Sequence, residues 1–324
     1  MICKFLNKAE TGFFIVLLFA SNVCAQTFIL PPDGVDVIGD IEYTSSHHDE
    51  TLLDIARRHN IGYREITLAN PGVDPWIPGE GTEILLPTRY ILPLAPRSGI
   101  VLNVPEMRLY YYPEPAKGEQ AVVVTYPVSI GRVDWQTPLG TTRIISKTAN
   151  PKWYPPESIR KEHEEKGDPL PKVVPAGPDN PLGNYALRLD IPGYLIHGTN
   201  KPAGIGMQVT HGCIRLYPEN IEFLYKKVKT GTKIHIVDQA YKAGWYGDRL
   251  YMEVHPALVD GKYVKSLNLT PMVRVLAKRT EKRTDYKLDW ERARSIATKP
   301  RGIPMDIPPI QTVESKEKEP APAP

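Results

Sequence analysis

Cysteine is scarce in this sequence. The chain of 324 residues holds three cysteines, Cys3, Cys24 and Cys213. The first two lie in an N-terminal segment that has the features of a removable export signal, so Cys213 is expected to be the single thiol of the mature protein. A single cysteine has no intramolecular partner. In an exported protein it therefore indicates a reactive thiol or an intermolecular disulfide.

Strong net charge and long apolar runs are also absent. The formal net charge is +3 and no basic stripe is visible, which argues against a nucleic-acid partner. The longest apolar run, residues 12–20, is short for a membrane span, so we expect no stable membrane insertion. Apolar and charged contents of 41% and 24% are typical of globular proteins, and the length allows two domains.

The first 25 residues have the order of a secretory signal peptide. Lys4 and Lys8 precede the apolar run 12–20, and small residues around Cys24 follow it. This order predicts a signal peptide over residues 1–25 that is cleaved on export. Two alternatives stay open: an uncleaved anchor, and a lipoprotein signal at Cys24, which the residues before that cysteine disfavour.

Residues 42–88 predict a small α+β module. Asp49 can cap a helix with an apolar stripe at Leu52, Ile55 and Ala56. A second helix is expected over residues 63–70, and a strand on either side completes a strand–helix–helix–strand order.

Residues 97–238 predict a mainly β domain of short strands separated by turns. The expected strands are residues 100–104, 108–112, 121–130, 141–146, 185–189, 194–196 and 234–236. A helix with an apolar stripe follows Pro218, because proline suits the first turn. Residues 150–184 form a long proline-rich loop with one short helix expected in 160–168. Such a loop is often an active-site lid, and a plain insertion is the alternative.

The C-terminal third gives weaker patterns. We expect an extension over residues 239–298, with a strand at 250–254 and an amphipathic helix at 284–298. Proline, glutamate and lysine dominate residues 299–324. This composition predicts a disordered tail that buries nothing.

The chemistry concentrates around Cys213. A thiol that attacks a carbonyl needs a base and donors for the oxyanion. His197, at a predicted strand end, suits the first role, and the carbonyl of Gly198 can orient its imidazole. The turn His211-Gly212-Cys213 offers the N–H groups of Gly212 and Cys213 as oxyanion donors.

Two further possibilities concern the same stretch. Arg215 can bind a substrate carboxylate through its guanidinium fork, although a structural salt bridge is an equal alternative. His197, His211 and Cys213 could instead ligate zinc, but one cysteine and no nearby acidic residue make a poor ligand set. We therefore expect neither a metal nor a cofactor.

Residues 42–88 resemble a LysM domain. The resemblance rests on Tyr43-Thr44, Asp49, Thr51-Leu52, Ile55-Ala56, Leu68-Ala69-Asn70-Pro71 and Ile84-Leu85-Leu86-Pro87. It implies binding to glycans that contain N-acetylglucosamine, including peptidoglycan. A structural spacer is the alternative, because His47-His48 replaces the residues common before the capping position.

Residues 97–238 resemble the YkuD-type L,D-transpeptidases. The resemblance is carried by His197-Gly198-Thr199, Thr210-His211-Gly212-Cys213-Ile214-Arg215, Thr137-Pro138-Leu139-Gly140 and Asn180-Pro181-Leu182-Gly183. It implies a β-sandwich-like catalytic domain without metal or cofactor. Cys213 would be the nucleophile, His197 the proton acceptor and donor, and His211 a residue that shapes the site. Thr199, Thr210 and Arg215 would contact substrate.

The same resemblance implies a periplasmic enzyme that acts on peptidoglycan stem tetrapeptides. Cys213 would release the terminal D-Ala and form a thioester with diaminopimelate, which an amine then attacks. The acceptor would be another diaminopimelate or a lysine of an outer-membrane lipoprotein. Two alternatives stay open: an L,D-carboxypeptidase that uses water, and a non-catalytic wall-binding protein.

Overall fold

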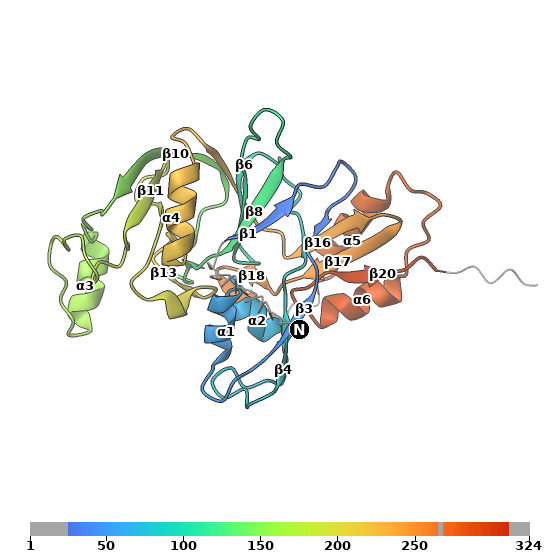
Figure 1. The fold of residues 1–324 in the computed structure, drawn as a ribbon, viewed down its shortest axis with the longest axis horizontal. Coiled ribbons are helices and arrows are strands. Elements are labelled where there is room, and N and C mark those ends of the chain that lie inside the picture. The colour runs from blue at the N-terminus through green and yellow to red at the C-terminus, as the bar shows by residue number, and fades with distance from the viewer. Residues whose placement is uncertain (1–24, 265–267, 311–324) are drawn as a thin grey trace, which may run out of the picture.

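The computed structural model describes residues 25–264 and 268–310 of the chain. Most of the predicted signal peptide, and residues 311–324 of the predicted tail, lie outside the described residues. The chain forms three units: an N-terminal unit (residues 25–96), a central unit (97–238) and a C-terminal unit (239–310) (Figure 1).

The N-terminal unit contains the predicted strand–helix–helix–strand order. Its elements are β1 (Gln26–Ile29), β2 (Val37–Ile38), β3 (Glu42–Ser45), α1 (Leu52–Arg58), α2 (Tyr63–Ala69), β4 (Glu83–Leu86) and β5 (Tyr90–Ile91). Strands β3 and β4 pair antiparallel around the two helices. The cap of α1 is Thr51, not the predicted Asp49, because Thr51 and Asp54 form a reciprocal capping box.

The central unit is built on one nine-stranded sheet. Its elements are β6 (Gly99–Asn103), β7 (Arg108–Tyr112), β8 (Val122–Pro127), β9 (Ile130–Gly131), β10 (Gly140–Ala149), α3 (Glu157–Glu165), β11 (Tyr185–Leu189), β12 (Leu195–His197), a 3-10 turn (Pro202–Gly204), β13 (Gln208–Thr210), β14 (Ile214–Arg215), α4 (Pro218–Lys227) and β15 (Lys233–Val237). The strand order is β1-β8-β7-β6-β15-β10-β11-β12-β14. Most of the predicted strands are present.

Strand β10 explains why the sheet is not the expected β-sandwich. Residues 140–143 pair with β15, whereas residues 144–149 pair with β11 across a register shift between Ile144 and Ser146. A bulge of this kind bends a strand and increases its twist. One long strand therefore belongs to both halves, and the mostly-strand prediction is right while the two-sheet arrangement is wrong.

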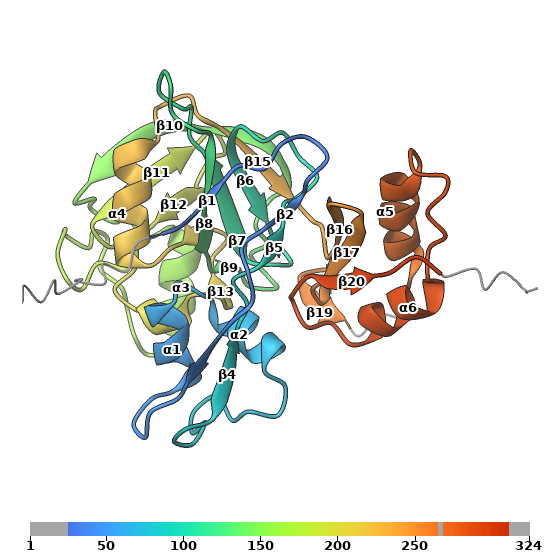
Figure 2. The ribbon, with the colours of Figure 1, turned by 45° about the vertical axis from the view of Figure 1, so that its right-hand side comes forward.

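The main core lies inside this bent sheet, under α4. Helix α4 lies against the sheet beside β11 and β12 (Figure 2). Its Ile221 and Leu224 pack with Leu187 and Ile196 of the sheet, and all four are at most 1% exposed. The opposite face of β6, β7 and β8 is covered by the N-terminal unit, including Tyr90. These strands are buried on both faces, which is why their sequences are apolar without alternation.

The C-terminal unit has a core of its own. Its elements are β16 (Tyr241–Tyr246), β17 (Arg249–Val254), β18 (Ala257–Val259), β19 (Lys262–Val264), α5 (Thr270–Thr280), α6 (Trp290–Thr298) and β20 (Met305–Ile307). Strands β16, β17 and β20 form a sheet that α5 and α6 cover. The sequence patterns missed α5 and placed the start of α6 too early.

Strand β20 contradicts part of the predicted tail. Residues 305–307 pair antiparallel with β17, and Ile307 is fully buried. Two apolar residues in three were too few to predict a strand among so many prolines. Within the described part of the chain, no helix is both long and apolar enough to cross a bilayer.

Polar contacts fix the three units to one another. Glu65 of α2 accepts two hydrogen bonds from Arg108 of β7, at 2.5 and 2.8 Å, in a buried pair. Asp36 accepts a hydrogen bond from the backbone of Trp245 at 3.1 Å and pairs with Arg279 of α5. The N-terminal unit therefore contacts both other units.

Candidate active site

Strands β12 and β14 bring the predicted site residues onto one face. The two strands pair in parallel, with Ile196 opposite Ile214 and His197 opposite Arg215. Both isoleucines enter the main core. Because side chains alternate along a strand, His197 and Arg215 lie on the other face, and Cys213 precedes β14 by one residue on that same face.

The sulfur of Cys213 contacts the backbone that leads into β12. Its Sγ lies 3.7 Å from the carbonyl oxygen of Gly193, and the N–H of Leu195 donates to the sulfur. Cys213 is a free, partly exposed cysteine. Burial raises the pKa of the thiol, although the Leu195 N–H and the charge of Arg215 lower it. Desolvation therefore outweighs both favourable contacts.

His197 is held as a neutral imidazole. It is 4% exposed, and its Nδ1 lies 2.7 Å from the carbonyl oxygen of Gly198. A carbonyl can only accept, so Nδ1 carries the proton and Nε2 keeps its lone pair. Burial, followed by the charge of Arg215, lowers the pKa of His197 to about 3. The expected orienting contact from Gly198 is present, and the ring is a base before any proton transfer.

The two groups are not joined in this state. Within the described residues, Cys213 and His197 each hydrogen-bond to backbone groups and not to one another. A neutral thiol and a neutral imidazole are consistent with that arrangement. Proton transfer would then accompany attack on a carbonyl.

The turn before Cys213 is tightly fixed. Gly212 has a φ of +96°, and a Cβ at this position would lie 2.7 Å from the ring of Tyr194. Both the backbone conformation and the lack of space for a side chain therefore require glycine. The hydroxyl of Thr210 donates to the carbonyl of Cys213 at 2.6 Å. Thr137 donates to the carbonyl of Gly212 at 3.0 Å and accepts from Gly131 at 3.0 Å.

These contacts define the candidate oxyanion donors. In the described part of the chain, no backbone carbonyl accepts from the N–H of Gly212 or Cys213. Both groups are therefore open to an incoming oxygen. Thr137 was noted in the sequence only as part of a resemblance, and a lone threonine in a loop gives no signal of this supporting role.

The threonines that were expected to contact substrate are turned inward. Thr199 and Thr210 are 4% and 2% exposed. The hydroxyl of Thr199 accepts from the N–H of Lys201 at 2.9 Å, and that of Thr210 is used within the turn. Both hydroxyls therefore stabilise backbone in this state.

The guanidinium of Arg215 lies close enough to Cys213 for their charges to interact. Its Nε is buried without a hydrogen-bond partner among the described residues, and no salt bridge of Arg215 occurs there. Burial lowers its pKa, while the nearby Cys213 raises it. The structural salt bridge that the sequence also allowed is therefore not formed among the described residues, and binding of a substrate carboxylate stays a prediction.

His211 points toward helix α3 of the long loop. Its Nε2 lies 3.1 Å from Oε2 of Glu162, and its ring packs edge-on against Trp135 with centroids 5.4 Å apart. Arg132 binds the same carboxylate. Burial lowers the pKa of His211 despite the neighbouring carboxylate. The expected helix is therefore present and touches the site.

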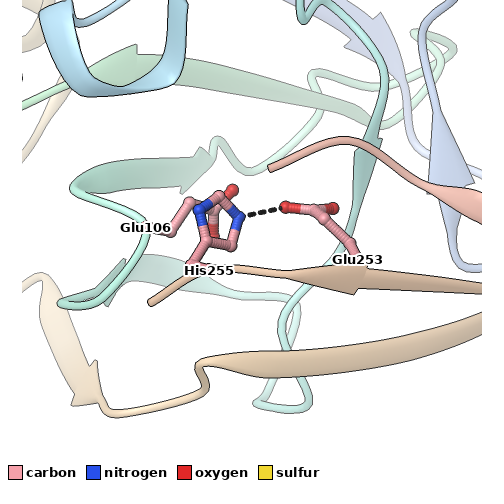
Figure 3. Close-up of side chains that lie close together, drawn as sticks. All are labelled: Glu106, Glu253 and His255. Carbon is pink, nitrogen blue, oxygen red and sulfur yellow. Dashed lines mark hydrogen bonds and ion pairs between the residues drawn. The ribbon is translucent and has the colours of Figure 1, made fainter. Parts of the chain in front are cut away.

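The zinc alternative finds no support in the geometry. In residues 25–264 and 268–310, ligand atoms converge only at Glu106, Glu253 and His255, far along the sequence from Cys213 (Figure 3). There, Nζ of Lys242 lies 2.8 Å from both glutamates. The ammonium group already supplies the positive charge that a metal would bring.

Known proteins are similar to this chain in sequence across the central unit, which contains Cys213. The YkuD family model, described as the L,D-transpeptidase catalytic domain, matches residues 97–236. The probable L,D-transpeptidase YcfS of Escherichia coli K12 is 44% identical over 73% of this chain and 74% of its own length. The probable L,D-transpeptidase YbiS of the same strain is 40% identical over 81% of this chain and 88% of its own.

Likeness to solved structures is more limited. An L,D-transpeptidase from Mycobacterium smegmatis covers 43% of this chain and 57% of its own, with 23% identity and a TM-score of 0.33. The family assignment therefore rests on the two relatives from Escherichia coli, because their sequence identity to this chain extends over most of its length and most of their own. The chain belongs to the YkuD family and is an L,D-transpeptidase.

Proposed function

We propose that this enzyme acts on stem tetrapeptides of peptidoglycan, with Cys213 as the nucleophile and His197 as the base. The observation that carries the proposal is the shared face of β12 and β14. It brings a thiol, a neutral imidazole with a fixed tautomer and an unpaired guanidinium together. The N–H groups of Gly212 and Cys213 complete the set as oxyanion donors.

The first half-reaction replaces an amide by a thioester. As Sγ of Cys213 bonds to the carbonyl carbon of diaminopimelate, Nε2 of His197 takes the thiol proton. The oxyanion is held by the Gly212 and Cys213 N–H groups. When the C–N bond breaks, the imidazolium returns that proton to the departing D-Ala amine, and Arg215 binds a carboxylate of the substrate.

The second half-reaction transfers the acyl group to an amine. The amine of another diaminopimelate, or of a lysine on an outer-membrane lipoprotein, attacks the thioester and loses a proton to His197. The thiolate of Cys213 leaves and is reprotonated. Water in place of the amine gives the carboxypeptidase reaction. Neither half-reaction requires a metal or a cofactor.

The N-terminal unit supports a wall location. We assign residues 42–88 as a LysM module that binds peptidoglycan glycan, supported by its strand–helix–helix–strand order and by the solvent-exposed Trp76, since aromatic side chains present a large apolar face to a ligand. Residues 1–25 are assigned as a cleaved signal peptide that directs the enzyme to the periplasm. The non-catalytic alternative is excluded by the family assignment.

Muropeptide turnover tests the proposal. The mature protein is incubated with a disaccharide tetrapeptide, with and without a candidate amine, and the products are identified by mass spectrometry. We expect release of D-Ala and a cross-linked product, loss of both in Cys213→Ala, and a rate lower by about 10²–10⁴ in His197→Ala. Activity that survives in Cys213→Ala would overturn the assignment, and a tripeptide as sole product would identify a hydrolase.

A further inference from the structure

One carboxylate of the enzyme occupies a cationic position beside the catalytic turn. Glu162 of α3 is bound by Arg132 and by Nε2 of His211, and both groups contact the same oxygen, Oε2. Arg132 is itself tied to the turn, because its N–H donates to the carbonyl of Thr210 at 2.9 Å. The cationic position therefore lies in the turn that carries Cys213.

The segment that delivers Glu162 is an arm with little other support. We define the arm as residues 154–173, closed at its base by two hydrogen bonds of 2.9 Å between Trp153 and Val174. Within α3, Ile159 is the buried residue. In the described part of the chain, the polar contacts from the arm to the rest of the protein are those of Glu162. A segment with so few buried contacts opens at low free-energy cost.

Glu162 does not use the full binding capacity of Arg132. The contact is made through Nη2, whereas Nε of Arg132 is buried without a hydrogen-bond partner among the described residues. A guanidinium binds a free carboxylate best through Nε and Nη together, as a bidentate fork. A carboxylate that is not tethered to a helix can make both bonds.

We propose that Arg132 and His211 form a carboxylate-binding subsite for the peptide substrate, and that Glu162 fills this subsite until substrate displaces the arm. The proposal rests on the proposed function. The ligand is a free carboxylate of the stem peptide, either the terminal one of D-Ala or the side-chain one of diaminopimelate. Glu162 is thus an internal competitor of the substrate. Substrate binds only to the fraction of molecules in which the arm is displaced.

Four variants test the subsite by steady-state kinetics. Glu162→Gln removes the competing charge, so KM for the tetrapeptide should fall by about threefold to tenfold with kcat retained. Glu165→Gln, an exposed position on the same helix, is the matched control and should not change KM. Arg132→Gln should raise KM by about tenfold or more, the scale of one lost charge-assisted hydrogen bond, and Arg132→Lys should recover part of the loss.

Two modified peptides identify the carboxylate. If the terminal carboxylate binds, amidating it should raise KM in the wild type and have no further effect in Arg132→Gln. If instead the side-chain carboxylate of diaminopimelate binds, amidating that carboxylate should raise KM in the wild type and have no further effect in Arg132→Gln. Either result supports the subsite. Melting curves of each variant verify that the fold is intact.

Two results would overturn the subsite. One is a lower kcat or a higher KM in Glu162→Gln, which would make the arm a required part of the closed site. The other is an Arg132→Gln variant that still discriminates between acid and amide peptides as the wild type does. Wild-type turnover of the tetrapeptide in the same assay shows that the proposed function stands even if the subsite fails.

Discussion

His197 and Arg215 are paired across strands β12 and β14, and the guanidinium adds to the effect of burial in keeping the imidazole neutral. The pKa of His197 is lowered from 6.5 to about 3. The unfolded chain therefore binds a proton on this residue below about pH 6.5 that the folded chain does not bind. His197 makes folding less favourable as the pH falls through this window, and its effect is absent above it.

This linkage gives a stability prediction. Between about pH 6.5 and 3, His197 should contribute a loss of up to about 1.4 kcal/mol in the free energy of unfolding per pH unit. His197→Asn keeps a donor for the Gly198 carbonyl but cannot be protonated, so its stability curve should be flatter by that amount. Urea unfolding from pH 4 to 8 measures it. His48→Asn, at an exposed position, should keep the wild-type slope; equal slopes in His197→Asn and wild type would contradict the prediction.

The second prediction concerns the thiol of Cys213, which is charged when deprotonated, whereas His197 is charged when protonated. Because burial raises the pKa of Cys213, the thiolate fraction near pH 7 is smaller than that of a free cysteine. Alkylation by iodoacetamide should be slow at pH 7 and increase about tenfold per pH unit up to a midpoint above 9. Arg215→Gln should raise the midpoint further, whereas Arg188→Gln, at an exposed position on β11, should not. A rate that is already maximal at neutral pH would show a preformed thiolate–imidazolium pair.

Thr137 gives a prediction about the turn. Its hydroxyl links the N–H of Gly131 to the carbonyl of Gly212, and the residue is 6% exposed. Thr137→Val keeps the shape but leaves both backbone groups unpaired, at a cost of about 1–3 kcal/mol. If this bond positions the oxyanion donors, kcat should fall while KM stays near the wild-type value. Thr148→Val, exposed on β10, is the control. A variant that loses stability but keeps kcat would assign Thr137 a purely structural role.

Local patterns predicted much of the fold. Strand β11 was expected at the residues where it occurs, and helix α4 begins at the expected Pro218. These elements have their apolar pattern and end signals within a few consecutive residues. Cys213 was chosen because it is the single cysteine outside the predicted export signal, and His197 because it ends a short predicted strand.

The features that were missed depend on residues far apart in the chain. The raised pKa of Cys213 follows from burial by the whole unit, which no neighbouring residue reveals. The contact of Glu162 with His211 joins a loop helix to a turn 49 residues later. The bend at β10 requires two different partner strands. Periodicity within one segment cannot indicate any of these.

Lys242 illustrates the same limit and gives a further prediction. Its side chain is 1% exposed, and its Nζ binds Glu106, Glu253 and the carbonyl of Ile91, each at 2.8 Å, so it joins all three units. Lys242→Met leaves two buried carboxylates without their cation and should cost about 3–5 kcal/mol. Lys229→Met, whose lysine forms only an exposed surface pair, should have no measurable effect. Equal denaturation midpoints for the two variants would contradict this account.

The end of the described chain provides the last prediction. Ile307 of β20 is fully buried and pairs with Leu250 of β17, so it belongs to the core of the C-terminal unit. Ile307→Ala should lower the free energy of unfolding by about 2–5 kcal/mol, the range for a buried isoleucine. Ile310→Ala, three residues later and 52% exposed, should change it by no more than about 0.5 kcal/mol.

Two truncations test the same strand. Truncation after residue 310 should be tolerated, because residues 311–324 are polar and rich in proline. Truncation after residue 304 removes β20 and should destabilise the unit at least as much as Ile307→Ala. Tryptophan fluorescence in urea reports all four, since Trp245 lies in the same core. If truncation after residue 304 leaves that transition unchanged, β20 contributes nothing to the unit, and the proline-rich end acts as a tail from residue 299 onward.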